Sequence, residues 1–188
     1  MVEATQAGRE LRRGAVGLIP TDTVVGLAAA ESGLERLARI KGRDPGKPVA
    51  ALCGSAEEAF ALAAAVPPLA QRLAELLWPG PLTLVLDAAG VGTIGVRVPD
   101  HAVVRKILAG YGGPLYATSA NLAGDPAPGS LDYVDESILR QADFAVEGEA
   151  GGGEASAVVD LSGGGSRLLR ATSWLDEERL PRIAAELE

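Results

Sequence analysis

Three cations stand close together on one short loop of the chain. Residues 41–48, KGRDPGKP, place Lys41, Arg43 and Lys47 among two glycines and two prolines that shape the loop. Three cations on such a loop suit a triphosphate, and lysine carries a compact charge on a flexible stem. The chain keeps two of its three lysines here, although it has 14 arginines. The charge pattern alone favours a solvated helix face, so both interpretations stay open.

Arg97 lies in the middle of an otherwise apolar stretch, residues 93–99, TIGVRVP. A half-buried arginine needs an anionic partner, and its planar fork matches a carboxylate. The partner is either a bound carboxylate or an acidic residue of the chain itself. In a strand, Arg97 shares its face with Gly95 and Pro99, which leave room beside it.

Hydroxyl, amide and carboxyl side chains follow two further apolar runs. Residues 20–27, PTDTVVGL, and residues 118–121, TSAN, place these groups directly after predicted strands. Strand ends are where α/β sheets usually bind ligands. The same residue types also form turns, so each segment taken alone favours a turn.

Several familiar sites are absent from the sequence. Residues 90–95 match GxGxxG, but strand-like alternation follows, which predicts a hairpin turn rather than a dinucleotide site. No GxxxxGK[ST] motif is present. One cysteine, Cys53, and one histidine, His101, exclude an internal disulfide and disfavour a zinc site and Ser–His–Asp or Cys–His catalysis.

Composition indicates an ordinary globular chain of 188 residues with 47% hydrophobic and 22% charged residues. Its net charge of −8 opposes loose attraction to nucleic acid. The longest apolar run is far short of the roughly 20 residues that a membrane helix needs. Residues 1–13 lack the apolar core of a signal peptide, so we expect no membrane partner and a cytoplasmic location.

Helices and strands alternate without a strict rhythm, which predicts one α/β domain with a twisted mixed sheet. Hydrophobic spacing predicts helices over residues 3–13, 34–41, 56–65, 68–77, 101–108 and 131–141, and from residue 173 onward. Ser32 and Asp100 are the expected N-caps of two of these helices. Strands are expected over residues 15–19, 48–53, 82–86, 94–98, 114–118, 143–146, 156–161 and 166–170, with residues 23–29 extended or in turns.

Taken together, these segments resemble the YrdC-like family of threonylcarbamoyl-AMP synthases. The resemblance covers about residues 14–171 and rests on seven motifs in order: PTDTVVGL, KGRDPGK, WPGPLTLVL, TIGVRVPDH, TSANLAGDPAP, SAVVDL and LLRAT. Each motif is weak alone, but chance agreement of all seven in this order is remote. The resemblance implies a single YrdC-like domain over residues 1–188, with helices flanking the sheet around a deep cleft.

The resemblance also implies an activity. Members of the family use ATP, L-threonine and bicarbonate or CO2 to make L-threonylcarbamoyladenylate, releasing pyrophosphate, for the threonylcarbamoyl modification of tRNA adenosine 37. Mg²⁺ is expected to accompany ATP, without a dedicated protein metal site. Downstream tRNA threonylcarbamoyl-transferase proteins are the expected recipients of the product.

By resemblance, Lys41 and Arg43 are the expected catalytic residues, within a phosphate-binding basic motif. The expected ATP contacts are Lys41, Arg43, Lys47, Thr93, Ser119, Asn121 and Arg170. The expected threonine contacts are Thr23, Arg97 and Ser156, with Arg97 placed for the carboxylate.

Three positions depart from the family pattern: Val25 stands where tyrosine is common, Leu52 where histidine is common, and Asp44 where proline usually follows the motif arginine. The first two remove polar groups near the expected threonine site, so they bear on amino-acid specificity more than on ATP binding. Two alternatives stay open. One is a carbamoyl-adenylate-forming enzyme of the same family with another substrate. The other is a double-stranded RNA-binding module, which the net charge opposes, leaving at most a weak RNA contact in a basic concavity.

Overall fold

One open sheet of nine strands organises the molecule. The computed structural model describes residues 1–44 and 49–185. The strands occur in this spatial order: β7 (Phe144–Ala145), β1 (Val16–Pro20), β2 (Val25–Ala29), β6 (Leu115–Ser119), β3 (Ala50–Leu52), β5 (Thr93–Arg97), β4 (Leu82–Asp87), β8 (Ala157–Asp160) and β9 (Arg167–Arg170). Three neighbouring pairs are parallel and five are antiparallel, so the sheet is mixed, as the sequence predicts.

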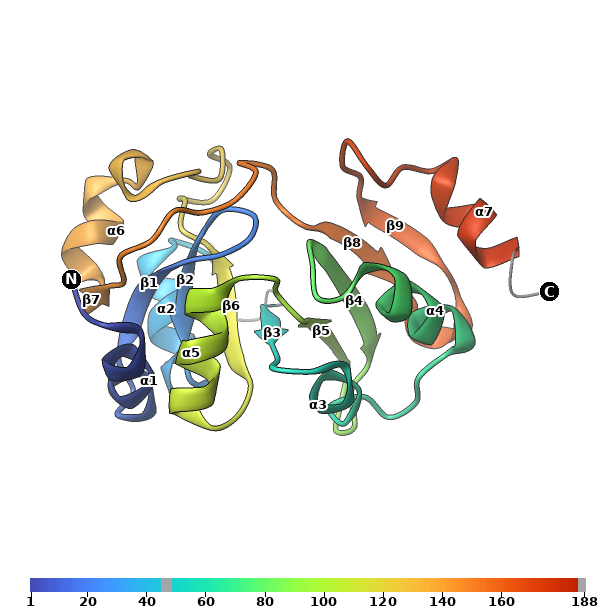
Figure 1. Cartoon of the computed structure of the whole chain (residues 1–188), viewed down its shortest axis with the longest axis horizontal. Helices are drawn as coiled ribbons and strands as arrows, with labels where there is room; N and C mark the ends of the chain where they lie inside the picture. The colour runs from blue at the N-terminus through green and yellow to red at the C-terminus, as the bar shows by residue number, and fades with distance from the viewer. Residues whose placement is uncertain (45–48, 186–188) are drawn as a thin grey trace.

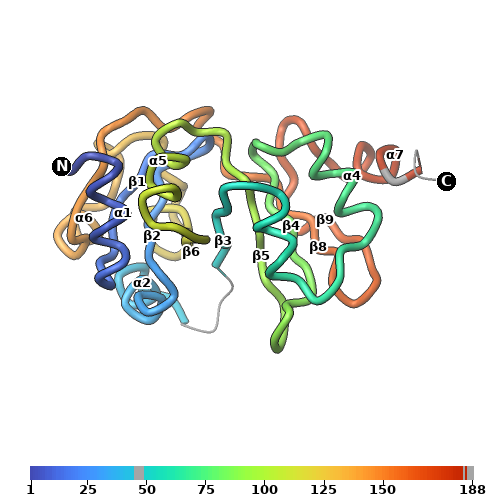
Figure 2. The backbone as a smooth tube through the Cα atoms, turned by 60° about the horizontal axis from the view of Figure 1, so that its bottom comes forward, coloured from blue at the N-terminus to red at the C-terminus, as the bar shows by residue number. Residues whose placement is uncertain are grey.

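The sheet has two halves joined through a short central strand. Figure 1 shows β7, β1, β2 and β6 on one side of β3, and β5, β4, β8 and β9 on the other. Figure 2 shows the same division from a second direction, with α1 and α7 at opposite ends of the long axis. Because β3 has only three residues, the two halves are linked by a narrow band of backbone hydrogen bonds.

Helices and short 3-10 turns connect and cover the strands. The helices are α1 (Ala4–Arg12), α2 (Leu34–Ile40), α3 (Ala56–Phe60), α4 (Pro68–Leu77), α5 (Ala102–Tyr111), α6 (Glu136–Gln141) and α7 (Arg179–Ala185). The 3-10 turns are η1 (Glu31–Gly33), η2 (Leu131–Tyr133) and η3 (Ser162–Gly164). None of the helices in the described ranges has the length and apolar character needed to cross a bilayer.

The strand register decides which side chains share a face. Ala117 on β6 lies opposite Ala50 on β3, Ala50 opposite Gly95 on β5, and Gly95 opposite Val85 on β4. Because strand side chains alternate between faces, these four positions lie on one face, which we call the front face. The front face of the β1–β2–β6 half also carries Leu115, which packs with α1 and α5 in one buried cluster.

The opposite face of the sheet is packed with helices in both halves. Leu18 and Leu27 share a buried cluster with residues of α2 and α6. Leu82, Leu84 and Leu86 share another with residues of α3, α4 and α7. The second half of the sheet therefore anchors its back face in the core, while its front face carries the smaller and more polar residues described below.

Two predicted helix caps are wrong. Ser32 caps nothing, because η1 precedes α2 and the N-cap of α2 is Gly33, which has no side-chain hydrogen bond. Asp100 instead forms an ion pair with Arg105, and His101 is the N-cap of α5. In each case the cap lies one residue later than the sequence pattern predicts.

Three predicted helices are shorter than expected. The helix expected over residues 56–65 ends at Phe60, because the following segment pairs with β4: the Ala64 N–H donates to the Asp87 carbonyl at 2.8 Å. The helix expected over residues 131–141 is divided into η2 and α6, and the last helix begins at Arg179.

A close contact between α1 and α5 gives a test of this packing. A Cβ at Gly8 would lie 2.8 Å from backbone atoms of α5, whereas a Cβ at Gly110 would make an ordinary 3.5 Å contact. We expect Gly8→Ala to lower the free energy of unfolding by about 1–3 kcal/mol, since overpacking outweighs the gain in helix propensity. Gly110→Ala, the matched control, should leave stability unchanged or raise it by up to about 1 kcal/mol. Equal effects of both substitutions in urea denaturation would contradict this packing.

Candidate active site

A cavity of about 270 Å³ lies on the front face of the sheet, where the two halves meet. Its floor is the row of small residues that the register aligns, Ala117, Ala50 and Gly95, with Val85 at one end. Short side chains in a central row leave a hollow between taller neighbours. A Cβ at Gly95 would lie in ordinary contact with Thr83 and Ala50 at 3.5–3.6 Å, so the glycine leaves space that any side chain would fill.

Lys41, directly after α2, lies at one end of this region and is only 6% exposed. Its ammonium donates to the backbone oxygens of Ser119 (2.5 Å) and Asn121 (2.9 Å) and to Asn121 Oδ1 (3.0 Å), and Ser119 Oγ lies 3.3 Å away. An ammonium has three N–H groups, so these four acceptors compete for them. Lys41 therefore ties the end of α2 to the loop that follows β6.

The interpretation of the basic cluster as a solvated helix face is wrong for Lys41. Burial and, to a smaller extent, the nearby charge of Arg43 lower the pKa of Lys41 to about 8. Arg43 lines the cavity, and burial lowers its pKa as well. Two cations held close together and partly removed from water favour an anionic ligand at this end.

Arg97 lies at the other end of the cavity and is 6% exposed. Its guanidinium donates to the Gly80 carbonyl (3.2 Å), Thr23 Oγ1 (3.0 Å) and Asp22 Oδ1 (2.7 Å). Burial lowers the pKa of Arg97, while the charge and hydrogen bond of Asp22 oppose that shift. The sequence predicts either a bound carboxylate or an acidic residue of the chain as the partner of Arg97. The structure contains the second, because Asp22 forms a buried ion pair with Arg97.

The turn between β1 and β2 positions Asp22 and Thr23. Thr21 Oγ1 donates to the Val24 carbonyl at 2.7 Å and accepts from the backbone N–H groups of Thr23 and Val24 at 3.2 Å. Side chains of threonine commonly stabilise turns in this way. The polar run that follows the first strand is thus a turn, and Thr21, Thr23 and Val24 in it line the cavity.

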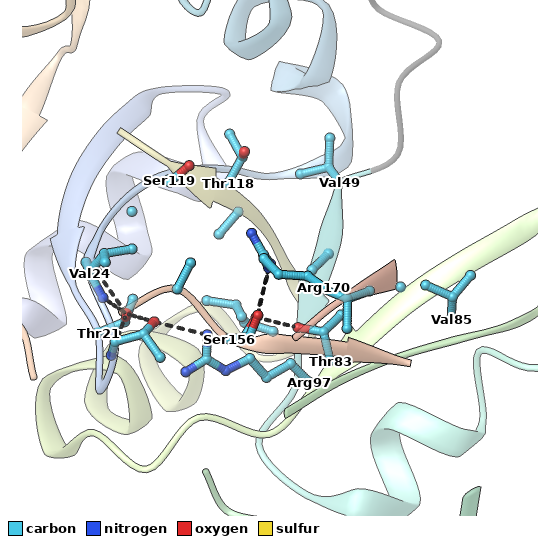
Figure 3. A pocket seen from close by; sticks show the side chains of 18 of the residues that line it. Thr21, Val24, Val49, Thr83, Val85, Arg97, Thr118, Ser119, Ser156 and Arg170 are labelled. Carbon is cyan, nitrogen blue, oxygen red and sulfur yellow. Dashed lines mark hydrogen bonds between the residues drawn. The ribbon is translucent and has the colours of Figure 1, made fainter. Parts of the chain in front are cut away.

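A third group of lining residues, Arg170 with Ser156 and Thr83, comes from the β4–β8–β9 side of the cavity. Arg170 donates to the Ser156 carbonyl (2.7 Å) and to Ser156 Oγ (3.3 Å), and the hydroxyls of Ser156 and Thr83 are 2.9 Å apart. Figure 3 shows the Arg170 side chain bonded to Ser156, with Thr83 on the other side of the same hydroxyl. Burial lowers the pKa of Arg170, and the charge of Arg97 adds to that shift.

The structure brings most of the predicted site residues together. Six of them line the cavity: Thr23, Arg43, Arg97, Ser119, Ser156 and Arg170. Lys41 and Asn121 do not line it; Lys41 is bonded to Ser119 in the cavity wall and to Asn121. Thr93 is exposed at the start of β5, on the same face as Gly95 and Arg97 but outside the lining. Lys47 lies outside the described residues.

The sequence reasoning missed Asp22 and Thr83 as site residues. Asp22 lies in the segment PTDTVVGL, for which the sequence leaves both a turn and a ligand contact open, but the sequence does not single it out. Thr83 lies on β4, within the motif WPGPLTLVL, and alternation from Val85 places it on the front face. Of the atypical positions, Leu52 borders the cavity and lies opposite Arg97 in the register, whereas Val25 is buried in the core.

Comparison with known proteins places this arrangement in a family. A family model described as Telomere recombination, Sua5_yciO_yrdC, matches residues 9–172. The chain belongs to this family. Threonylcarbamoyl-AMP synthases from Pyrococcus abyssi and Chromohalobacter salexigens are 33% and 35% identical to it; the alignments cover 94% and 82% of the chain, and 56% and 90% of those proteins.

Solved structures of the family agree with the fold. A crystal structure of P. abyssi Sua5 complexed with L-threonine is 32% identical, with a TM-score of 0.88 over 97% of the chain and 57% of that protein. The chain spans between 48% and 61% of the length of the first five curated relatives it matches. The part of the chain that the family model matches, residues 9–172, contains the nine strands of the sheet and the residues that line the cavity.

The lowered pKa of Lys41 predicts that any binding of an anionic ligand at this end depends on pH. Because this pKa lies near 8, the amine is charged at pH 7 and loses its proton as the pH rises. We expect the affinity for ATP, the ligand expected from the sequence, to fall roughly tenfold between pH 7.5 and pH 9, since about one proton must be taken up on binding. Calorimetry in two buffers of different ionisation enthalpy would measure that proton.

Lys41→Arg is the control, because arginine stays charged throughout this range. Its affinity for ATP should be lower at pH 7.5 but independent of pH. Equal pH dependence in the wild type and in Lys41→Arg would assign the titration to another group.

Proposed function

We propose that the chain is a threonylcarbamoyl-AMP synthase, which makes L-threonylcarbamoyladenylate from ATP, L-threonine and bicarbonate or CO2. One observation carries the proposal: a single cavity has buried or half-buried cations at both ends, with hydroxyls and small residues between them. Two anionic substrates can therefore lie end to end in it. The names of the family members and the threonine complex of P. abyssi Sua5 support the same assignment.

The proposed reaction has two steps. The amine of threonine adds to CO2 with loss of a proton, forming a carbamate. A carbamate oxygen then attacks the α-phosphorus of ATP, the bond to the β-phosphate oxygen breaks, and pyrophosphate leaves. Neither step needs a protein nucleophile, so the protein contributes positioning and charge neutralisation. This requirement suits a cavity whose lining consists of arginines, hydroxyls and small apolar groups.

At the nucleotide end, Lys41, Arg43, Lys47 and Arg170 supply positive charge to the triphosphate and to the departing pyrophosphate. Lys41 and Arg43 are the proposed catalytic residues, and Thr93, Ser119 and Asn121 the proposed polar contacts of the nucleotide. We propose that Mg²⁺ enters with the nucleotide, whose phosphates would supply much of its coordination.

At the amino-acid end, Arg97 holds the carboxylate of threonine, with Thr23 and Ser156 beside it. Three of the five N–H groups of the guanidinium are used by Gly80, Thr23 and Asp22. In the described part of the chain, the other two N–H groups have no acceptor and are available to a ligand. We further propose that the reaction takes place in the cytoplasm and that the product serves the modification of tRNA adenosine 37 through downstream transferase proteins.

The assignment is tested by identifying products. The protein is incubated with ATP, bicarbonate and L-threonine, and threonylcarbamoyl-AMP is sought by mass spectrometry, with serine and valine in parallel reactions. Omission of bicarbonate is the control and should abolish the product. An adenylate formed with another amino acid but not with threonine would keep the reaction and overturn the substrate.

The substitution Arg97→Lys tests whether the two ends of the cavity bind different substrates. Lysine keeps the charge but loses the planar fork, which removes a charge-assisted hydrogen bond of about 1.5–3 kcal/mol. We expect the affinity for threonine to fall roughly tenfold to hundredfold, and the affinity for ATP to change far less. Arg167→Lys, at an exposed arginine paired with Asp160, is the matched control. Equal losses for threonine and ATP would mean that Arg97 serves the fold or the phosphates instead.

A further inference from the structure

The carboxylate of Asp22 is paired on one side only. Oδ1 accepts from Arg97 at 2.7 Å, while Oδ2 is buried and has no hydrogen-bond partner in the described part of the chain. Asp22 is absent from the cavity lining, whereas Arg97 is part of it. The acid therefore lies behind the guanidinium, and it acts on a ligand through Arg97 and through its charge.

Backbone contacts fix the position of Asp22. The N–H of Gly151 donates to the Thr21 carbonyl at 2.8 Å, and the N–H of Gly153 donates to the Thr23 carbonyl at 3.1 Å. A Cβ at Gly151 would lie only 2.7 Å from the Asp22 carbonyl oxygen, so this backbone approach needs glycine. Together with the hydrogen bonds of Thr21, these contacts hold the turn from both sides.

Asp22 also changes the charge at its end of the cavity. No acidic residue is among the described residues that line the cavity, and Arg170 has no acidic partner there either. The Arg97–Asp22 pair carries no net charge, whereas the hydrogen bonds of Lys41 go to uncharged oxygens of Ser119 and Asn121. A ligand with a carboxylate but no ammonium group, or a phosphate, would accept hydrogen bonds from the Arg97 guanidinium but would be repelled by the charge of Asp22. A carboxylate with a neighbouring ammonium would be repelled much less.

We propose that Asp22 is a positioning and selectivity residue: it orients Arg97 and makes that end of the cavity favour a zwitterionic amino acid over an anion that lacks an ammonium group. The inference rests on the proposed function, because it takes the Arg97 end to be the amino-acid subsite. It also explains how two anion subsites in one cavity stay distinct. Phosphates are left to the other end, where the hydrogen bonds of Lys41 go to oxygens of Ser119 and Asn121, whereas Arg97 is paired with a carboxylate.

The test compares two ligands that differ in one charge. L-Threonine and 3-hydroxybutanoate share the carboxylate and the hydroxyl, but only threonine has the ammonium. Binding of each is measured by ligand-observed NMR without ATP, so that no turnover is needed. We expect Asp22→Asn to reduce the preference for threonine by roughly tenfold, the typical effect of one adjacent charge on an ionic equilibrium.

Two control variants separate this effect from a loss of structure. Asp22→Glu keeps the charge, so the ratio of the two affinities should stay as in the wild type even where both affinities fall. Asp143→Asn breaks another aspartate–arginine pair, with Arg36 on the surface, and should leave both affinities unchanged. If Asp22→Asn does not fold, Asp22→Glu decides the question, and a collapsed ratio in that variant overturns the proposal.

The remaining outcomes distinguish this proposal from the proposed function. An unchanged ratio in folded Asp22→Asn overturns the selectivity role alone. Loss of both ligands in that variant would mean that Asp22 only places Arg97, which also overturns selectivity. Wild-type protein that binds neither ligand overturns the proposed function together with this inference.

Discussion

The buried guanidinium of Arg97 is the constraint on which the site depends. Taking an arginine out of water is costly unless its donors find acceptors, and here they come from separate parts of the chain. Arg97 itself lies on β5 in one half of the sheet, while Asp22 and Thr23 belong to the turn between β1 and β2 in the other. The central strand between the halves has three residues, so this polar contact adds a second connection across the cavity. The residue proposed to bind substrate thus also fixes the spacing between the walls.

Lys41 makes a similar connection at the opposite end. Its ammonium joins the end of α2 to the loop after β6, and both Ser119 and Asn121 are held through it. Between these two cations the floor is built from alanine and glycine, whose short side chains leave the space that Arg97 and Lys41 border. The cavity therefore results from small residues in the middle of the sheet and from charged residues that tie its ends.

Sequence reasoning predicted the elements well wherever hydrophobic period and glycine or proline agreed, as for α4 between Pro68 and Leu77 and for the hairpin from β4 to β5. It failed where tertiary contacts compete with local preference. Residues after Phe60 have helical composition but pair with β4 instead. The order of the motifs predicted which residues lie together at the cavity. It did not predict which of these residues form hydrogen bonds or ion pairs with one another. That Arg97 pairs with Asp22 depends on a register between strands far apart in sequence, which no local pattern encodes.

In the proposed function, the two ends of the cavity would bind their ligands differently. Lys41 already donates to Ser119 and Asn121, so a phosphate must share or replace these acceptors. Arg97 keeps its internal partners and offers only its remaining N–H groups. In the proposed function, the nucleotide end would therefore rearrange on binding, while the amino-acid end is already organised. Such a combination would suit a reaction in which one product, pyrophosphate, must leave from the phosphate end. On a protein of net charge −8, such local cations hold their ligands at short range, where burial strengthens each contact.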